Sequence, residues 1–223
     1  MPESSESQTE RHVDPGLPLG SYSDEVLCEC PNCGGPARVR ASVHWSVPIS
    51  TREARAQCLR CSFSRELADG KWRGPILGYR KQPCPNCGYR WLVVEVFRER
   101  PDSRLKKAEK VCCPLCREMS ELQLEWLREE NTNRPIDPYF GLPLWLQSNC
   151  CCKVLWAYNR RHLNAIRSYI AAVRRERGGA SGKWSMVARL PAWVKSAKNR
   201  EAVLKCITRL EAKCDEAGLF ENR

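Results

Sequence analysis

The sequence predicts an α+β protein: two tandem small β modules, each built around a metal ion, followed by a small C-terminal helical domain. Four C-x-x-C pairs lie between residues 30 and 116 and predict the metal ions. Apolar and polar residues alternate between the pairs, which is the period of a strand with one buried face. After residue 159, apolar residues recur every three or four positions, as on the buried face of a helix.

The four cysteine pairs predict two closed metal sites. Two thiolates separated by two residues can occupy adjacent corners of one metal tetrahedron, and a second pair completes a four-sulfur zinc site. Such a site has no open coordination position, so it stabilises structure and does not catalyse. The expected ligands of the first zinc ion are Cys30, Cys33, Cys58 and Cys61, and those of the second are Cys84, Cys87, Cys113 and Cys116.

The two sets of four cysteines repeat one another. The pairs recur at offsets of 54 and 55 residues, the loops 34–57 and 88–112 hold 24 and 25 residues, and CPNCG opens both sets. These residues resemble the transcription-factor-type zinc ribbon, in two copies and over residues 28–120 only. The resemblance implies two structural zinc ions and a place either in the nucleic-acid machinery or in protein docking. It does not extend to the C-terminal domain.

The cysteines outside these pairs leave alternatives open. The total of 15 is odd and no export signal is evident, so reduced thiolates on zinc fit better than disulfides. Cys28 and Cys112 stand close enough in sequence to replace a neighbouring ligand. The run Cys150–Cys152 is either a set of small buried side chains, a redox-sensitive spot, or part of a third metal site. The further ligands of such a third site would come from His162, Cys206 and Cys214.

Residues 1–27 are predicted to form a flexible acidic arm. They hold six acidic residues against one Arg and few large apolar groups, which cannot offset the entropy of ordering them. The first zinc-ribbon module is expected over residues 28–82, with Gly34 and Gly35 permitting the turn beneath the metal. Its expected elements are a strand over 38–45, a turn at Pro48, a return over 51–57, and a strand with a hairpin over 63–72.

The second zinc-ribbon module is expected over residues 83–130. A β-rich run over 90–97, a turn at Pro101-Asp102 and a return over 105–111 repeat the first module. The segment after Cys116 follows neither period cleanly, so a closing strand and a departing helix are both open. Residues 131–138, with three Asn or Asp and two Pro, are predicted to be a linker.

A basic helical domain is expected over residues 139–217. The apolar run Tyr139–Leu146 is predicted to seal its core. Asn159 is the expected N-cap of a helix that runs to about Arg177, where Gly178-Gly179 would end it. Further helices are expected over 186–190, over 192–198 after Pro191, and from the N-cap Asn199 to about Lys213.

The positive charge belongs mainly to the C-terminal third. The formal net charge is +11, and residues 141–223 hold 16 basic against six acidic residues. Two four-thiolate zinc sites would lower the net charge to roughly +7. Arg160, Arg167 and Arg174 stand seven residues apart, which predicts a basic ridge along the long helix. The alternative is an ordinary solvated helix face. The predicted nucleic-acid contacts are Arg160, Arg161, Arg167, Arg174, Arg175, Lys195, Lys198 and Arg200.

The residues favour a binding protein over an enzyme. Zinc deaminases combine P-C-x-x-C with an upstream H-x-E, and His44-Trp45-Ser46 lacks the glutamate. With three histidines and no other catalytic motif, we expect no enzyme and no small-molecule substrate. The predicted function is non-enzymatic binding of DNA or RNA, and the alternative is a protein–protein adaptor. No apolar run spans a membrane and the N-terminus is polar, so we expect no membrane partner and a cytoplasmic location.

Overall fold

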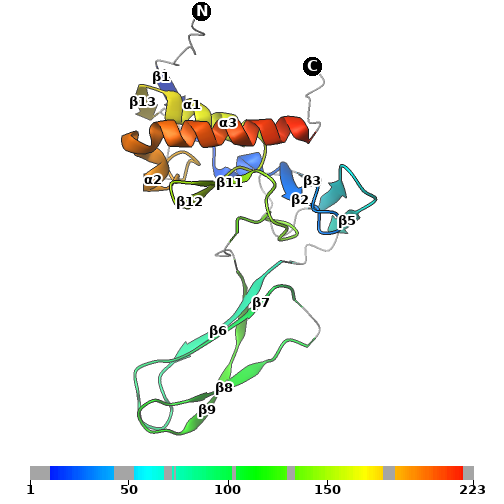
Figure 1. Cartoon of the computed structure of the whole chain (residues 1–223). Coiled ribbons are helices and arrows are strands. Elements are labelled where there is room, and N and C mark those ends of the chain that lie inside the picture. The colour runs from blue at the N-terminus through cyan, green and yellow to red at the C-terminus, as the bar shows by residue number, and fades with distance from the viewer. Residues whose placement is uncertain are drawn as a thin grey trace, which may run out of the picture.

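The chain folds into a larger part that contains every described helix and a smaller part built only from strands (Figure 1). We refer to residues 11–74 and 134–217 as the body, and to residues 75–129 as the second module. The computed structural model describes residues 11–42, 53–67, 72, 74–101, 104–129, 134–177 and 184–217.

The first cysteine module forms one antiparallel sheet in the body. Its strands are β2 (Glu25–Glu29), β3 (Pro36–Ala41), β4 (Ala54–Cys58) and β5 (Ser64–Leu67), in the order β2-β3-β4-β5. Alternate residues of β3 and β4 face inward, and the buried Val39 and Ala56 are partners across the two strands. This confirms a strand after the first cysteine pair and a returning strand before the second. The predicted turn at Pro48 and most of the predicted 69–72 hairpin lie outside the described residues.

The second module is a three-stranded sheet with a hairpin packed on one face. Strands β6 (Ile76–Gln82), β7 (Leu92–Arg98) and β10 (Glu125–Arg128) form the sheet β10-β6-β7, and β8 (Ala108–Cys112) pairs with β9 (Met119–Gln123). The segment after Cys116 is therefore β-structure. Residues 76–82 pair with β7 and β10, so they belong to this module and not to the first, contrary to the expected boundary at 82.

The second module has its own small core and returns the chain to where it left the body. Leu92, Val94 and Leu122 are buried together between the sheet and the hairpin. At the root of the module, the Glu129 N–H donates a hydrogen bond of 3.0 Å to the Pro75 carbonyl. The module therefore begins and ends at one point of the body.

The helical part of the body consists of α1 (Arg160–Ala171), the short α2 (Ala192–Lys195), the 3-10 turn η3 (Ala197–Asn199) and α3 (Arg200–Glu216). Asn159 caps α1 as predicted: its side-chain oxygen accepts the His162 N–H at 2.8 Å. Val173, which was expected on the buried face of the long helix, lies beyond the end of α1 and is exposed. The other residues expected on the buried faces of the two long helices are buried: Leu163, Ile166, Ile170, Val203, Ile207, Leu210 and Cys214. None of the helices in the described ranges is long and apolar enough to span a membrane.

This region contains one hairpin that was not predicted, and two local expectations for it are wrong. A hairpin of β11 (Gln147–Cys150) and β12 (Lys153–Trp156) precedes α1, and Cys151 and Cys152 form its turn with φ of 51° and 58°. Residues 186–190 form turns and not a helix. Asn199 does not cap α3 through its side chain, which instead donates a hydrogen bond of 2.9 Å to the Trp193 carbonyl.

The long helix ends six residues earlier than expected, at Ala171 and not at Arg177. Residues Arg174–Arg177 form strand β13, which pairs in parallel with β1 (Arg11–Asp14). Ala172 already has the extended backbone of a strand, with ψ of 134°. Pairing with a strand from the other end of the chain has therefore overridden the local helical pattern.

The predicted flexible arm is also wrong for residues 11–27. Besides β1, this segment contains the 3-10 turn η1 (Leu19–Tyr22) and the first half of β2. The buried Asp14 carboxylate accepts the Ser185 hydroxyl at 2.6 Å, and Leu27 is 1% exposed. Long-range partners supply the ordering free energy that the local composition lacks. Residues 1–10 lie outside the described part of the chain.

One core joins the first module to the helices. Val26 and Ala56 of the sheet are buried in the same cluster as Leu144, Ile166 and Leu210. The backbone of Leu27 is also shared, because its N–H donates to Tyr158 and its carbonyl accepts from Trp145. The first module and the helical domain are thus one folding unit, where the sequence had predicted two.

Asp137 organises the segment that was expected to be a linker. Its carboxylate is completely buried and accepts the N–H groups of Tyr139, Phe140 and Leu142 at 2.9, 2.8 and 2.6 Å. These bonds fold the run 139–146 back onto the core. Of the four residues expected to seal it, Phe140, Leu142 and Leu144 are buried and Trp145 is partly buried. Burial raises the pKa of Asp137 to about 6, despite the three N–H donors.

Candidate metal centres and basic surface

The first group of four sulfurs forms where the tips of two hairpins meet. The pair Cys30–Cys33 connects β2 to β3, and the pair Cys58–Cys61 connects β4 to β5. Because β3 and β4 are paired in register, the two tips are brought together. The Sγ atoms of Cys30 and Cys61 lie 3.7 Å apart, and those of Cys33 and Cys58 lie 3.6 Å apart.

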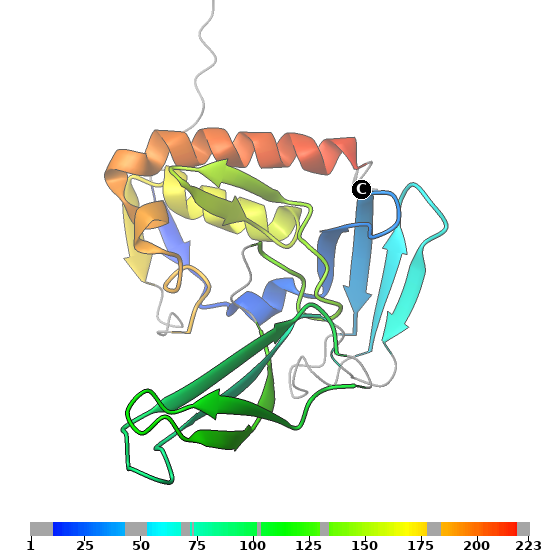
Figure 2. The same ribbon diagram turned by 60° about the horizontal axis from the view of Figure 1, so that its bottom comes forward.

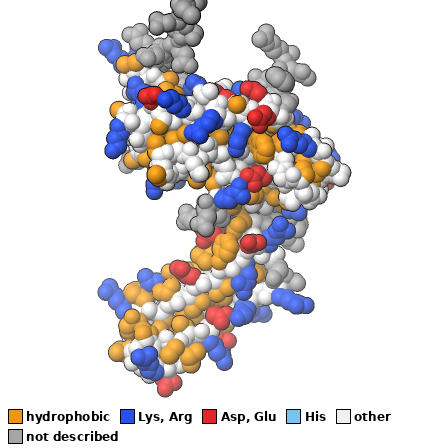
Figure 3. Space-filling model, viewed as in Figure 1, with side chains coloured by type: hydrophobic (Ala, Val, Ile, Leu, Met, Phe, Trp, Pro, Cys, Tyr) orange, Lys and Arg blue, Asp and Glu red, His pale blue; other side chains and the backbone are white. Residues whose placement is uncertain are grey.

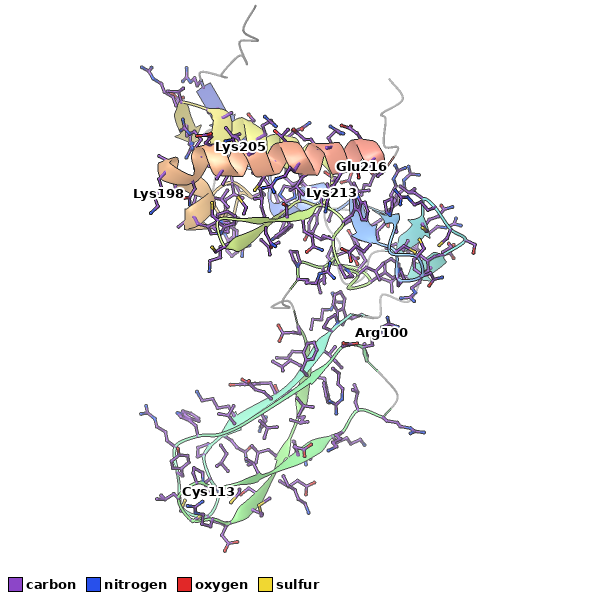
Figure 4. All side chains as sticks on the ribbon, in the orientation of Figure 1. Arg100, Cys113, Lys198, Lys205, Lys213 and Glu216 are labelled. Atoms are coloured by element: carbon purple, nitrogen blue, oxygen red, sulfur yellow. The ribbon has the colours of Figure 1, made fainter. Side chains whose placement is uncertain are left out.

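The second group repeats this arrangement at the far tip of the second module, where Figure 4 labels Cys113. The pair Cys84–Cys87 connects β6 to β7, and the pair Cys113–Cys116 connects β8 to β9. The Sγ atoms of Cys84 and Cys116 lie 3.8 Å apart, and those of Cys87 and Cys113 lie 3.7 Å apart. In each group, all four sulfurs lie within 4.8 Å of one another. The prediction that eight named cysteines gather in two sets of four is confirmed.

Both groups have the donor set and the size of a structural zinc site. Four sulfurs about 2.3 Å from a tetrahedral zinc ion lie about 3.8 Å apart, which matches the spacings in this chain. Burial raises the pKa of Cys58, but the N–H groups of Arg60 and Cys61, each 3.2 Å from its sulfur, bring the pKa down to about 6. Backbone N–H groups likewise lower the pKa of Cys113 to about 7 against the opposing effect of burial. The two sites can hold two metal ions, and their thiolates suit zinc.

The positions of the other cysteines show which of them can be metal ligands. Cys28 and Cys112 belong to neither group of four. Burial raises the pKa of the Cys28 thiol well above its usual value, which makes it a poor ligand. The run at residues 150–152 occupies the turn between β11 and β12. Within the described ranges, no third group of three or more ligands gathers there or elsewhere.

The predicted basic ridge along one helix does not form. Arg160 pairs with Asp215, Arg161 pairs with Asp24, and Arg167 makes a two-pronged contact with Glu211 at 2.6 and 2.7 Å. Two of these pairs tie α1 to α3, and the third ties α1 to the segment before β2. The three arginines therefore hold the body together and carry little free positive charge.

The other five predicted contacts gather at one end of the body, which we call the basic end. It comprises Arg174 and Arg175 in β13, Lys195 in α2, Lys198 in η3 and Arg200 at the start of α3. Figure 1 shows these elements side by side at one end of α3, and Figures 3 and 4 show basic side chains there, with Lys198 labelled.

Hydrogen bonds connect the elements that carry the basic end. Arg175 donates to the Lys195 carbonyl at 3.0 Å, and Arg200 donates to the Ala172 carbonyl at 3.3 Å. None of the five side chains pairs with a carboxylate of a described residue. The acids nearby in sequence are already used, since Glu176 pairs with Arg11 and Glu201 pairs with Lys205. This end of the body therefore has uncompensated positive charge.

Sequence reasoning missed an aromatic and basic surface next to the basic end. Trp184 is 75% exposed, and the Arg189 guanidinium lies 5.6 Å from its ring centre. Similarly, the Arg128 guanidinium lies over the ring of Trp72, 4.9 Å from the ring centre. No periodic pattern marks these residues, because Trp72 lies in a connection and Trp184 follows a stretch outside the described residues. The only available signal was the high Trp content of eight residues in a basic chain.

No family model, curated protein or solved structure matches the chain, so the likeness to zinc ribbons rests on the geometry of the cysteines alone.

Proposed function

We propose that this chain is a non-enzymatic protein, held together by two structural zinc ions, that binds nucleic acid through the basic end. The observation that carries the proposal is the group of five basic side chains without carboxylate partners. Like charges held together on a folded surface repel one another, and a polyanion relieves that repulsion. Phosphates of DNA or RNA also release counterions when such a surface binds them.

The metal sites support a structural role for zinc in this proposal. Each ion would be surrounded by four thiolates, which leaves no position for a water molecule or a substrate. The sites lie at the tips of the hairpins, away from the basic end. Zinc would therefore fix the strands, and the basic surface of the helical part would bind the ligand.

The proposal predicts a charge-dependent loss of binding in the double variant R174Q/K198Q. Both side chains are exposed, so the fold should be retained. If each contacts one phosphate, the slope of log affinity against log salt should fall by about 1.4 to 1.8. The measurement is a titration of mixed-sequence DNA and RNA by fluorescence anisotropy at four or more salt concentrations.

The matched control removes the same charge from the second module. Lys107 and Lys110 are exposed there, and K107Q/K110Q should leave the salt slope as it is in the wild type. Equal effects of the two double variants would show that only total charge matters and would contradict binding through the basic end. Undetectable binding of the wild type at low salt would contradict nucleic-acid binding altogether.

A second candidate function, the protein adaptor, is favoured by one observation. The outer face of the β10-β6-β7 sheet carries the cross-strand row Leu127, Leu77 and Phe97, whose end members are 52% and 50% exposed. The exposed Glu95 lies on the same face, two residues from Phe97. This face suits a protein segment that presents apolar and basic side chains.

The adaptor function predicts a partner that depends on this sheet face. In a pull-down from nuclease-treated lysate, a bound protein should be retained by the wild type and by R174Q/K198Q, and lost with F97S. If every protein partner disappears after nuclease treatment, the adaptor function is wrong and nucleic-acid binding remains.

A further inference from the structure

Two adjoining cavities open next to the basic end. The outer cavity has a volume of about 670 Å³ and lies between η1, the segment 134–138, β12, the segment 184–189 and the root of the second module. The inner cavity, of about 390 Å³, reaches toward α1 and α2. Both volumes fall in the range of ligand sites, roughly 300–1,000 Å³. Figure 2 shows η1 between the region of α2 and the root of the second module. The two cavities share Leu19, Val154, Trp156 and Arg189.

The outer cavity is lined with aromatic side chains that are already in place. Trp72, Trp156, Tyr158 and Trp184 all contribute to its wall. Trp72 is fixed, because its Nε1 donates to the Pro75 carbonyl at 2.7 Å and a Cβ on Gly74 would lie only 2.4 Å from its ring. Trp184, by contrast, presents most of its ring to solvent. A wall of this kind offers flat surfaces on which planar ligands stack.

The charge of the outer cavity is positive. Arg128, Arg134 and Arg189 line it, together with a single acid, Asp137, although Arg134 is paired with Glu29 at 2.7 Å. The Asp137 carboxylate is completely buried and turned to the N–H groups of residues 139–142, so it does not face the cavity. Lys195 of the basic end donates a hydrogen bond of 3.0 Å to the carbonyl of Ala188, the residue before Arg189. The Arg189 side of the cavity therefore adjoins the basic end.

The inner cavity is largely apolar, with Arg189 and His162 as its two polar lining residues besides the tryptophans. His162 lines it with Trp156, Trp193 and Met186. Burial lowers the pKa of His162 to about 3, so the ring is neutral. Its Nδ1 accepts the Tyr158 N–H at 3.2 Å, which places the proton on Nε2. That Nε2–H makes no hydrogen bond to any residue that the structure describes. A polar ligand atom could accept this proton, and Arg189 would lie in the same cavity.

We infer that the two cavities receive unstacked bases of a single-stranded nucleic acid. A base in the inner cavity would lie among the tryptophans and accept the His162 Nε2–H, and a neighbouring base would stack on Trp184. The phosphates between them would meet Arg189 and the basic end. A paired base in a duplex cannot enter a cavity, so the site would prefer single strands. This inference rests on the proposed function and adds the class of nucleic acid to it.

The test compares W184A with W91A on three kinds of oligonucleotide. Trp91 is a matched control, because it is also exposed and covered by a cation, with Lys81 4.6 Å from its ring centre. The probes are a fluorescein-labelled 12-nucleotide single strand, made as DNA and as RNA, the duplex of the same sequence, and a strand with abasic spacers in place of bases. W184A should bind the single strand about 5- to 100-fold more weakly than the wild type, and W91A should not.

The other two probes separate the inference from the proposed function. The wild type should bind the abasic strand at least as weakly as W184A binds the normal strand, because the abasic strand loses both bases, and W184A should leave duplex binding unchanged. Equal binding of normal and abasic strands, still sensitive to R174Q/K198Q, would overturn base recognition and leave the basic end in place. No binding of any probe at low salt would overturn both.

Discussion

Cys58→Ser is expected to unfold the whole body, and Cys113→Ser is expected to unfold only the second module. The reason is that Cys58 belongs to the core shared by the first sheet and the helices, while Cys113 belongs to the small separate core of the second module. Binding of a structural zinc ion contributes about 10–16 kcal/mol, which equals or exceeds the total stability of a typical domain, about 5–15 kcal/mol. Loss of one ligand therefore removes the unit that the ion holds.

Circular dichroism distinguishes the two outcomes, because every described helix lies in the body. The wild type should contain two zinc ions per chain, and each variant should contain one. Cys58→Ser should lose most of its helical signal near 222 nm, and Cys113→Ser should keep it. Cys112→Ser is the matched control, since it changes a neighbouring thiol outside both groups and should retain two ions. Equal helical signals in Cys58→Ser and Cys113→Ser would contradict the shared core.

Asp137→Ala is expected to destabilise the body by about 3–6 kcal/mol. The substitution leaves three buried N–H groups without an acceptor, and each costs about 1–3 kcal/mol. The same groups hold the run 139–146 against the core, so no nearby water can easily replace the carboxylate. Urea unfolding followed by tryptophan fluorescence would measure the loss. Asp137→Asn keeps one carbonyl oxygen for two of the three donors and should cost less than Asp137→Ala.

The pH dependence of this effect follows from the raised pKa of Asp137. The folded state holds the carboxyl proton up to about pH 6, whereas an unfolded Asp releases it near the ordinary value of 3.8. Between these values the folded state binds more protons, so the stability contributed by Asp137 falls as the pH rises toward 6 and is constant above it. Measured between pH 5 and 7.5, the advantage of the wild type over Asp137→Asn should shrink with rising pH. An advantage that grows with pH would contradict the raised pKa.

Patterns that depend on neighbouring residues could be predicted from the sequence. The C-x-x-C spacing identified all eight clustered cysteines, and the Asn159 cap identified the start of α1. Both are local signals, because a C-x-x-C pair or an N-cap is completed within about four residues. The apolar faces of α1 and α3 were found for the same reason.

Features that depend on distant partners could not be predicted. Strand β13 exists because β1 pairs with it from more than 160 residues away, and no local pattern announces such a pairing. The acidic partners of Arg160, Arg161 and Arg167 likewise come from other elements, so spacing alone suggested a free ridge. The shared core was missed because β2 lies in a segment whose composition resembles a flexible tail.

The hydrogen bond between Glu129 and Pro75 has a consequence for how the chain is made. It closes the second module, the 55 residues 75–129, into an insertion within the body. The body is therefore made of two segments of the chain, one before and one after this insertion. During synthesis the inserted unit is complete as soon as residue 129 has left the ribosome, whereas the body still awaits residues 144–210 for its core. The zinc ion nearer the C-terminus should thus be locked into a finished fold first, and the nascent body should stay open until the last helix arrives.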